Sequence, residues 1–120
     1  MGEAPPHDLL SSGSEALAEA DWQRARTCFE MALELGQSVE ALEGLARALQ
    51  WLGEYDDAVR ARERAFTACT RRGMPLKASD HARALAFLHA AVYGNEAAAS
   101  GWVARAERLL EGIEESPQHG

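Results

Sequence analysis

Two histidines are the first side chains of this 120-residue chain to consider for chemistry, because imidazoles bind metals and transfer protons. His81 and His89 are eight residues apart on a predicted helix. They therefore lie near one face of it but two turns from each other, too far apart to share a metal ion without other ligands. We interpret them as ordinary core or surface histidines, and we expect no metal site.

An acidic pair and a cysteine are also better explained by structure than by catalysis. Asp56 and Asp57 are adjacent, so on a helix they point in different directions, and acids in a first helical turn favour the helix dipole. Cys28 would be reactive only beside a base, and the local sequence implies none. No glycine-rich phosphate loop follows a strand. We therefore expect no catalytic residues, no enzymatic activity and no cofactor.

The composition predicts one all-α domain with no sheet. Hydrophobic residues make up 47% of the chain and charged residues 26%, and alanine is abundant whereas β-branched residues are rare. Cys28 and Cys69 have no partner at metal spacing, which indicates a reduced, cytoplasmic protein. No apolar run approaches the ~20 residues of a membrane span, and the N-terminus lacks the regions of a signal peptide. We expect no membrane contact.

Charge is distributed unevenly along the chain, whose formal net charge is −7. Residues 1–58 carry 12 acidic and 3 basic side chains, whereas residues 59–120 carry 7 acidic and 9 basic ones. Because affinity for phosphates is largely a charge term, we expect no direct contact with nucleic acid. The basic side chains of residues 59–83 could meet an acidic partner or form a solvated helix face. They are Arg60, Arg62, Arg64, Arg71, Arg72, Lys77 and Arg83.

Capping signals and apolar periodicity divide the chain into six predicted helices. Asp21, Ser38 and Asn95 are predicted N-caps, and Ser12 with Glu15 fits a capping box. The expected helices cover residues 9–20, 22–35, 39–52, 54–71, 75–93 and 96–113. A flexible arm is expected at residues 1–7, the helical domain at 8–114 and a flexible tail at 115–120.

Glycines are expected to end four of these helices, at positions 36, 53, 73 and 94, with Gly36 as a left-handed stop. Gly101 lies inside the last helix and is expected to mark a kink or a close helix crossing. The residues expected to face the core include Leu9, Ala20, Phe29, Leu42, Tyr55, Leu85, Val92, Tyr93, Trp102 and Val103.

The second and fourth predicted helices share a pattern at a separation of 33 residues, which places Trp22 on Tyr55, Ala25 on Ala58 and Ala32 on Ala65. A repeat of this length made of two helices indicates a stacked solenoid. The pattern resembles the tetratricopeptide repeat (TPR). In the first copy the resemblance rests on Gly13, Asp21, Trp22, Ala25, Phe29 and Ala32, and in the second on Leu45, Ala46, Gly53, Tyr55, Ala58 and Ala65.

The resemblance implies a right-handed superhelix of three antiparallel helix hairpins. Its small residues stand where two helices would cross at roughly 8–10 Å, and its large aromatics fill the space beside the crossing. Arg62 departs from the family pattern, since an aromatic is common there. The third hairpin fits loosely, because Ala106 lies 48 residues after Ala58 and so needs about 14 extra residues.

Two strings of the chain carry a narrower likeness. EGLARALQWLGEYDDAVRARERAF and GWVARAERLLEG are similar to the helical-repeat segments of actinobacterial LuxR-type helix-turn-helix transcriptional regulators. The 11 arginines against a single lysine agree with such an origin. The likeness implies that this chain is the repeat part of a bacterial regulator and that the DNA-binding part lies outside it.

The TPR resemblance also implies a concave groove lined by the first helix of each hairpin. It maps onto Glu43, Arg47, Gln50, Trp51, Asp80, Arg83 and Phe87. A tryptophan beside an arginine is typical of a peptide-binding hot spot, although Trp51 could instead pack on the fifth helix. We therefore expect a regulatory or interaction module with a protein or peptide partner. The alternatives are a small-molecule sensor domain and a homo-oligomeric scaffold, with a homodimer formed through the sixth helix.

Overall fold

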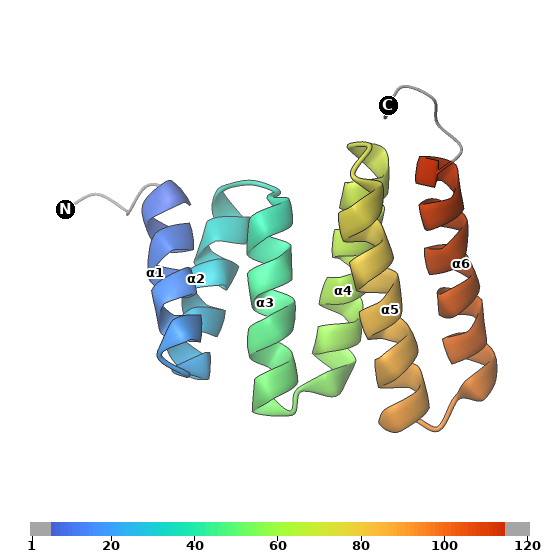
Figure 1. The fold of residues 1–120 in the computed structure, drawn as a ribbon. Coiled ribbons are helices and arrows are strands. Elements are labelled where there is room, and N and C mark those ends of the chain that lie inside the picture. Colours follow the sequence, from blue (N-terminus) through green and yellow to red (C-terminus); the bar gives the residue numbers. More distant parts are fainter. Residues whose placement is uncertain (1–5, 115–120) are drawn as a thin grey trace. The chain divides into compact units, whose positions relative to one another are not determined.

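The computed structural model describes residues 6–114, and this part of the chain is entirely α-helical and loop, without a strand (Figure 1). The order of the helices is α1 (Pro6–Ala18), α2 (Trp22–Leu35), α3 (Val39–Leu52), α4 (Tyr55–Arg71), α5 (Pro75–Ala91) and α6 (Glu96–Glu114). None of these helices is both long and apolar enough to cross a bilayer.

Side-chain caps begin three of the helices, as the sequence predicts. Asp21 accepts from the backbone N–H of Arg24 at 3.2 Å, and Ser38 accepts from that of Ala41 at 3.2 Å. Asn95 caps α6 in the same way, through the N–H of Ala98 at 3.0 Å. Each cap satisfies one of the backbone donors that a first helical turn leaves without an intrahelical partner.

The predicted capping box at Ser12 and Glu15 is wrong, because α1 begins at Pro6 and both residues lie inside it. Pro6 is tolerated there since the first turn of a helix does not need its missing N–H. The helix thus starts within the residues expected to form a flexible arm. The remaining terminal predictions, at residues 1–5 and 115–120, lie outside the described residues.

The ends of α3 and α4 show why glycine follows them. Gly53 and Gly73 have φ of 78° and 68°, in the left-handed region, and the next residue in each case donates to the carbonyl five residues before it. The sequence predicts the same for Gly36, but its backbone is extended, with φ of 160° and ψ of 158°. The chain therefore leaves α2 in an extended conformation and runs directly toward the cap of α3.

Ala20 takes the left-handed position at the end of α1. The sequence predicts it as a buried helical residue, whereas it lies beyond the helix, is exposed and has φ of 59°. The N–H of Asp21 donates to the carbonyl of Ala16 at 2.8 Å, which closes the same type of turn that Gly53 makes. A side chain therefore occupies a backbone conformation that favours glycine.

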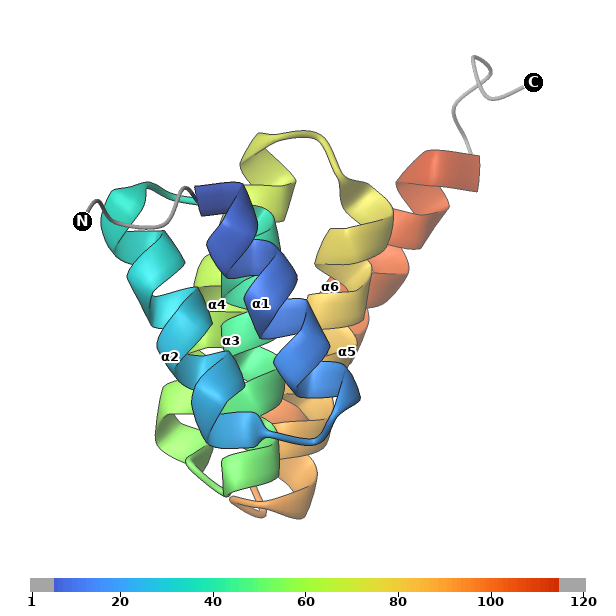
Figure 2. The same ribbon diagram turned by 90° about the vertical axis from the view of Figure 1, so that its left-hand side faces the viewer.

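The helices form two compact units, Met1–Ala61 and Arg62–Gly120. In the first unit, α1 packs on α2, and both contact α3 (Figure 2). Phe29 of α2, 2% exposed, fills the centre of this unit, with its ring between Gly13 of α1 and Gly44 of α3. Gly13, which the repeat pattern marks as a small position, is thus confirmed as a contact point.

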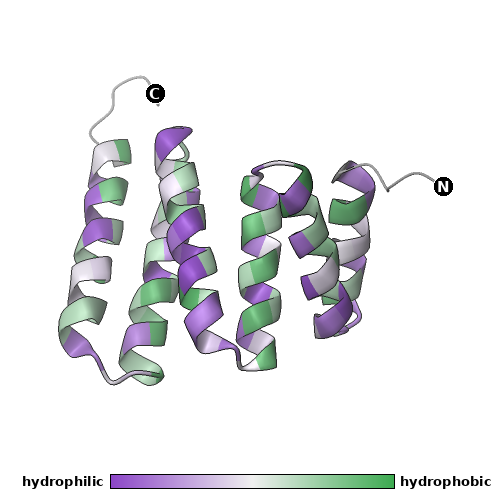
Figure 3. Ribbon diagram, turned by 180° about the vertical axis from the view of Figure 1, so that it is seen from behind, coloured by the Kyte–Doolittle hydropathy of each residue, from purple (hydrophilic) through white to green (hydrophobic). Residues whose placement is uncertain are grey.

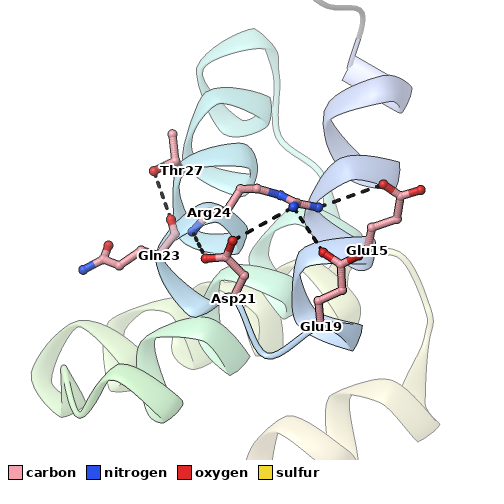
Figure 4. A network of polar contacts seen from close by, with 6 residues as sticks. All are labelled: Glu15, Glu19, Asp21, Gln23, Arg24 and Thr27. Carbon is pink, nitrogen blue, oxygen red and sulfur yellow. Dashed lines mark hydrogen bonds and ion pairs between the residues drawn. The ribbon is translucent and has the colours of Figure 1, made fainter.

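Arg24 joins α1 to α2 on the surface of the first unit (Figure 4). Its guanidinium lies 3.2 Å from the carboxylate of Glu19 and 4.0 Å from those of Glu15 and Asp21. These are exposed charges, so each pair is screened by water and contributes little to the free energy of unfolding. The network orients the turn between the two helices more than it stabilises it.

In the second unit, α5 packs along α6, and the aromatic rings of α4 and α6 meet. Phe66 and Trp102 form an edge-to-face contact with centroids 5.1 Å apart, and the guanidinium carbon of Arg105 lies 4.4 Å from the Trp102 ring centroid. Small residues fill the rest of the core, including Ala78, Ala82, Ala99 and Ala106, with Leu85 and Leu88 as the large aliphatic members.

Hydrophilic and hydrophobic residues are interspersed along the helices (Figure 3). Some of the predicted core positions are exposed. Tyr55 is exposed because it opens α4, Val92 and Tyr93 because α5 ends before them, and Val103 because it lies on the outer side of α6. The helix α6 continues through Gly101, and a Cβ added there would meet no atom within 4 Å. Gly101 therefore marks no close helix crossing.

Candidate interaction surface

The exposed side of α3 carries the first four residues of the predicted groove. Arg47 and Trp51 are exposed, whereas Glu43 and Gln50 are half-buried and already have interaction partners. Arg47 and Trp51 are one helical turn apart, so they are neighbours on the same side of the helix. The opposite side of α3 is buried, with Leu42, Leu45 and Leu49 in the core.

Trp51 is held in place even though 67% of its surface is exposed. Its ring stacks on that of Trp22, the first residue of α2, with centroids 5.0 Å apart and planes within 6°. An aromatic ring that is exposed yet ordered loses little conformational entropy when a partner binds, which is one reason why tryptophan is common in hot spots. The sequence alone did not predict this contact.

The exposed side of α5 carries the other three predicted residues, Asp80, Arg83 and Phe87. Phe87 is 64% exposed, an unusual position for a phenylalanine. Leu76 in the first turn of α5 is 63% exposed and shares this side, because 76, 80, 83 and 87 follow steps of four, three and four residues. Leu76 is a surface residue that sequence reasoning missed.

Asp80 and Arg83 are charged residues of the predicted groove on α5. Within residues 6–114, neither side chain makes an ion pair or a hydrogen bond, although they are three residues apart on one helix. Both side chains are exposed. They remain available to charges on another molecule.

The two surfaces share a short sequence. Residues 46–52 read ARALQWL and residues 82–88 read ARALAFL, at a separation of 36 residues. In both copies the arginine is exposed, the leucine two residues later is buried, and the aromatic four residues after the arginine is about two-thirds exposed. This internal repeat was visible in the sequence and would have pointed to both arginine–aromatic pairs.

The two pairs belong to different units. Glu43, Arg47, Gln50 and Trp51 lie in the first, and Asp80, Arg83 and Phe87 lie in the second. Each surface therefore stands as a property of its own helix.

The remaining candidates are structural or half-buried. His81 is 2% exposed, and its Nδ1 lies 3.1 Å from a guanidinium nitrogen of Arg62. Because a guanidinium can only donate, Nδ1 accepts and the ring hydrogen resides on Nε2. His89 is half-buried, with its ring 5.9 Å from that of Tyr93, and Cys28 is half-buried on α2.

The basic side chains of residues 59–83 do not form a uniform strip of unpaired charge. Arg62 turns toward His81 and Lys77 is half-buried, while Arg60 is exposed but pairs with Asp57 inside the first turns of α4. Asp56 and Asp57 occupy the first turn of that helix, as expected from the helix dipole. The other exposed members of the set are Arg64, Arg71, Arg72 and Arg83.

A search of protein-family models and of curated proteins finds no match to this chain. Its function is therefore inferred from the two surfaces.

Proposed function

We propose that this chain is a protein-interaction module that binds peptides or helices through the arginine–aromatic surfaces of α3 and of α5. The observation that carries the proposal is the repeated pair, Arg47 with Trp51 and Arg83 with Phe87. A large exposed aromatic on a stable helix normally costs solubility, so its recurrence at the same register of two helices favours a binding role. Arginine and tryptophan are also the residues that most often dominate binding energies.

A TPR-like arrangement is part of this proposal. On α2, α4 and α6 two buried alanines stand seven residues apart, at Ala25 and Ala32, Ala58 and Ala65, and Ala99 and Ala106. Aligned on these alanines, the third hairpin follows the second by 41 residues rather than 48, so relative to a repeat of about 34 residues it needs about 7 extra residues instead of 14. The register supports three hairpins of one kind.

The chemistry of the surfaces defines the partner. A guanidinium next to an aromatic face favours a partner segment that carries an acidic side chain followed by an apolar one. The two would be one turn apart in a helical partner and two residues apart in an extended one. We expect a partner segment with acidic and apolar residues, in the extended or helical form that groove-binding modules accept. The aromatic contacts would supply most of the affinity, and the arginines would set the choice of partner.

A random-peptide library selected against the immobilised chain tests this proposal. Affinities of the selected peptides are then measured for the unchanged protein, for Arg47→Ala with Trp51→Ala, and for Arg83→Ala with Phe87→Ala. A peptide should lose about tenfold or more in affinity when the pair that it contacts is removed. Arg108→Ala with Val103→Ala, which removes an exposed arginine and an exposed apolar side chain from α6, should leave the affinity unchanged. Peptides that bind all variants equally would overturn the proposal.

We also propose that the module belongs to a bacterial transcriptional regulator, on the resemblance of its arginine- and alanine-rich strings to the repeats of LuxR-type proteins. The intact mass of the natural gene product tests this part separately. A product far heavier than 13.0 kDa, with a helix-turn-helix in the additional sequence, is the expected result. A product of that mass alone would overturn the regulator assignment and leave the binding proposal standing.

A further inference from the structure

The exposed stripe of α5 is complementary to itself when its direction is reversed. From Leu76 to Phe87 its members are apolar, acidic, basic and apolar, at positions 76, 80, 83 and 87. Leu76 and Phe87 stand equally far outside the midpoint between Asp80 and Arg83. An antiparallel second copy would therefore place leucine against phenylalanine at both ends and aspartate against arginine twice in the middle.

The spacing of the stripe suits such a pair of helices. Its three steps cover 11 residues, an average of about 3.7 residues per step, which is close to the 3.6-residue turn of a straight helix and keeps the four side chains on one face of α5. The stripe runs over 12 residues, and the 11 steps from Leu76 to Phe87 rise about 16 Å along the helix axis. It thus offers four successive layers, two apolar outside and two ionic inside.

We infer that two copies of this chain associate through α5, antiparallel and about a two-fold axis that passes between Asp80 and Arg83. An isologous contact of this kind requires that if one residue meets a second, the second also meets the first, and both kinds of layer satisfy this condition. The absence of intramolecular partners for Asp80 and Arg83, among residues 6–114, leaves both charges free for the second copy.

The same residues predict a weak but oriented dimer. One short helix pair buries less surface than a stable dimer normally needs, and ionic layers in a helical seam contribute less than apolar ones. The ionic layers do fix the direction and register of the two helices, because a parallel pair would place aspartate against aspartate and arginine against arginine. We expect reversible association with a dissociation constant on the order of 100 µM.

Self-association would also regulate the proposed peptide binding. This consequence rests on the proposed function, whereas the dimer itself does not. The second copy covers Arg83 and Phe87, so a peptide that binds this pair competes with the dimer. Binding of such a peptide should then weaken as the protein concentration rises, whereas a peptide selected by Arg47 and Trp51 should be unaffected.

Sedimentation of the full chain from about 10 µM to about 1 mM tests the inference. The unchanged protein should pass from monomer to dimer over this range. Asp80→Arg alone and Arg83→Asp alone should each raise the dissociation constant about tenfold or more, because like charges then face each other. The Asp80→Arg result is the sharper one, since this change makes the net charge less negative and so reduces general repulsion between copies.

Two experiments that should restore the dimer distinguish specific pairing of Asp80 with Arg83 from a general effect of net charge. The double variant Asp80→Arg with Arg83→Asp should dimerise as the unchanged protein does. An equimolar mixture of the two single variants should form a heterodimer, because one chain then carries two arginines in the middle of the stripe and the other two aspartates. Glu107→Arg, an exposed reversal on α6, should leave the dimer intact.

A chain that stays monomeric throughout, single variants that still dimerise, or a mixture that stays monomeric would each overturn the inference. Failure of the peptide selection would leave it standing, because self-association does not require Arg47 or Trp51. Conversely, loss of the dimer with peptide binding retained would overturn the self-association alone.

Discussion

Gly44 of α3 lies so close to the ring of Phe29 of α2 that a Cβ at position 44 would overlap three ring carbons. Gly13 of α1 faces the same ring, where a Cβ would come within 2.6 Å of Cζ. Phe29 is 2% exposed, so its ring is enclosed by protein and cannot turn into solvent to relieve such an overlap. The two glycines thus allow three helices to converge on one phenylalanine.

Gly44→Ala should therefore lower the free energy of unfolding. Alanine is the better helix former by about 1 kcal/mol, but overpacking a filled core costs about 1–3 kcal/mol. Gly101→Ala is the matched control, because Gly101 is also helical and a Cβ there meets nothing within 4 Å. Gly101→Ala should raise the free energy of unfolding through the higher helix propensity of alanine, because no overlap opposes it. Chemical denaturation that finds the two variants equally stable would contradict the close packing of Phe29.

Most helix boundaries could be predicted from the sequence because the signals that set them are local. Asp21, Ser38 and Asn95 act within one turn, and the ends of α2 and α3 lie where periodicity and caps place them. Predictions failed where the same residue type has two structural uses. Ser12 fits a cap but lies inside α1, and Gly36 fits a left-handed stop but is extended.

The candidate surface was harder to predict, because exposure depends on which side of a helix the neighbouring helices cover. The resemblance to a repeat family selected seven residues. Five of them are exposed, namely Arg47, Trp51, Asp80, Arg83 and Phe87, whereas Glu43 and Gln50 are half-buried. The resemblance could not supply the stacking of Trp51 on Trp22, which depends on the packing of α2 against α3. Leu76 was missed because a leucine in a helix is normally assigned to the core.

Ala20→Gly should stabilise the protein. Ala20 has φ of 59°, and the left-handed conformation costs a residue with a Cβ about 1–2 kcal/mol relative to glycine. Its exposed side chain contributes no core packing that the change would remove. Thermal unfolding should show a gain of about 1 kcal/mol. Gly53→Ala introduces the same strain at the end of α3 and should destabilise the protein by a similar amount. If Ala20→Gly and Gly53→Ala changed the free energy of unfolding in the same direction, left-handed strain would not be the cause.

The Trp22–Trp51 stack should appear as a coupling energy. A double-mutant cycle on the free energy of unfolding, with Trp22→Ala and Trp51→Ala, should give a coupling energy of about 0.5–1.5 kcal/mol. This is the range that aromatic pairs contribute in addition to the burial of their surface. Trp51→Phe is the control, because it keeps a ring over Trp22 and should retain most of the coupling. Additive single effects would mean that the two rings do not stack in solution.

The two cysteines should differ in their reaction with a thiol reagent. Cys28 of α2 is half-buried, whereas Cys69 of α4 has no exposed surface. In the native protein one thiol should react and the second should wait for local or global opening, because a buried sulfur must first be exposed. In denaturant both should react at similar rates.

Two single variants assign the kinetic phases of this reaction. Cys28→Ser should leave only the slow phase, and Cys69→Ala should leave only the fast one. The slow rate follows the opening of the second unit. Trp102→Ala removes the contact with Phe66 and should therefore increase the rate at which Cys69 reacts. The reaction rate of Cys28 in the same variant is the reference for intrinsic thiol reactivity. Equal rates for the two cysteines in the native protein would place Cys69 at the surface and contradict its burial.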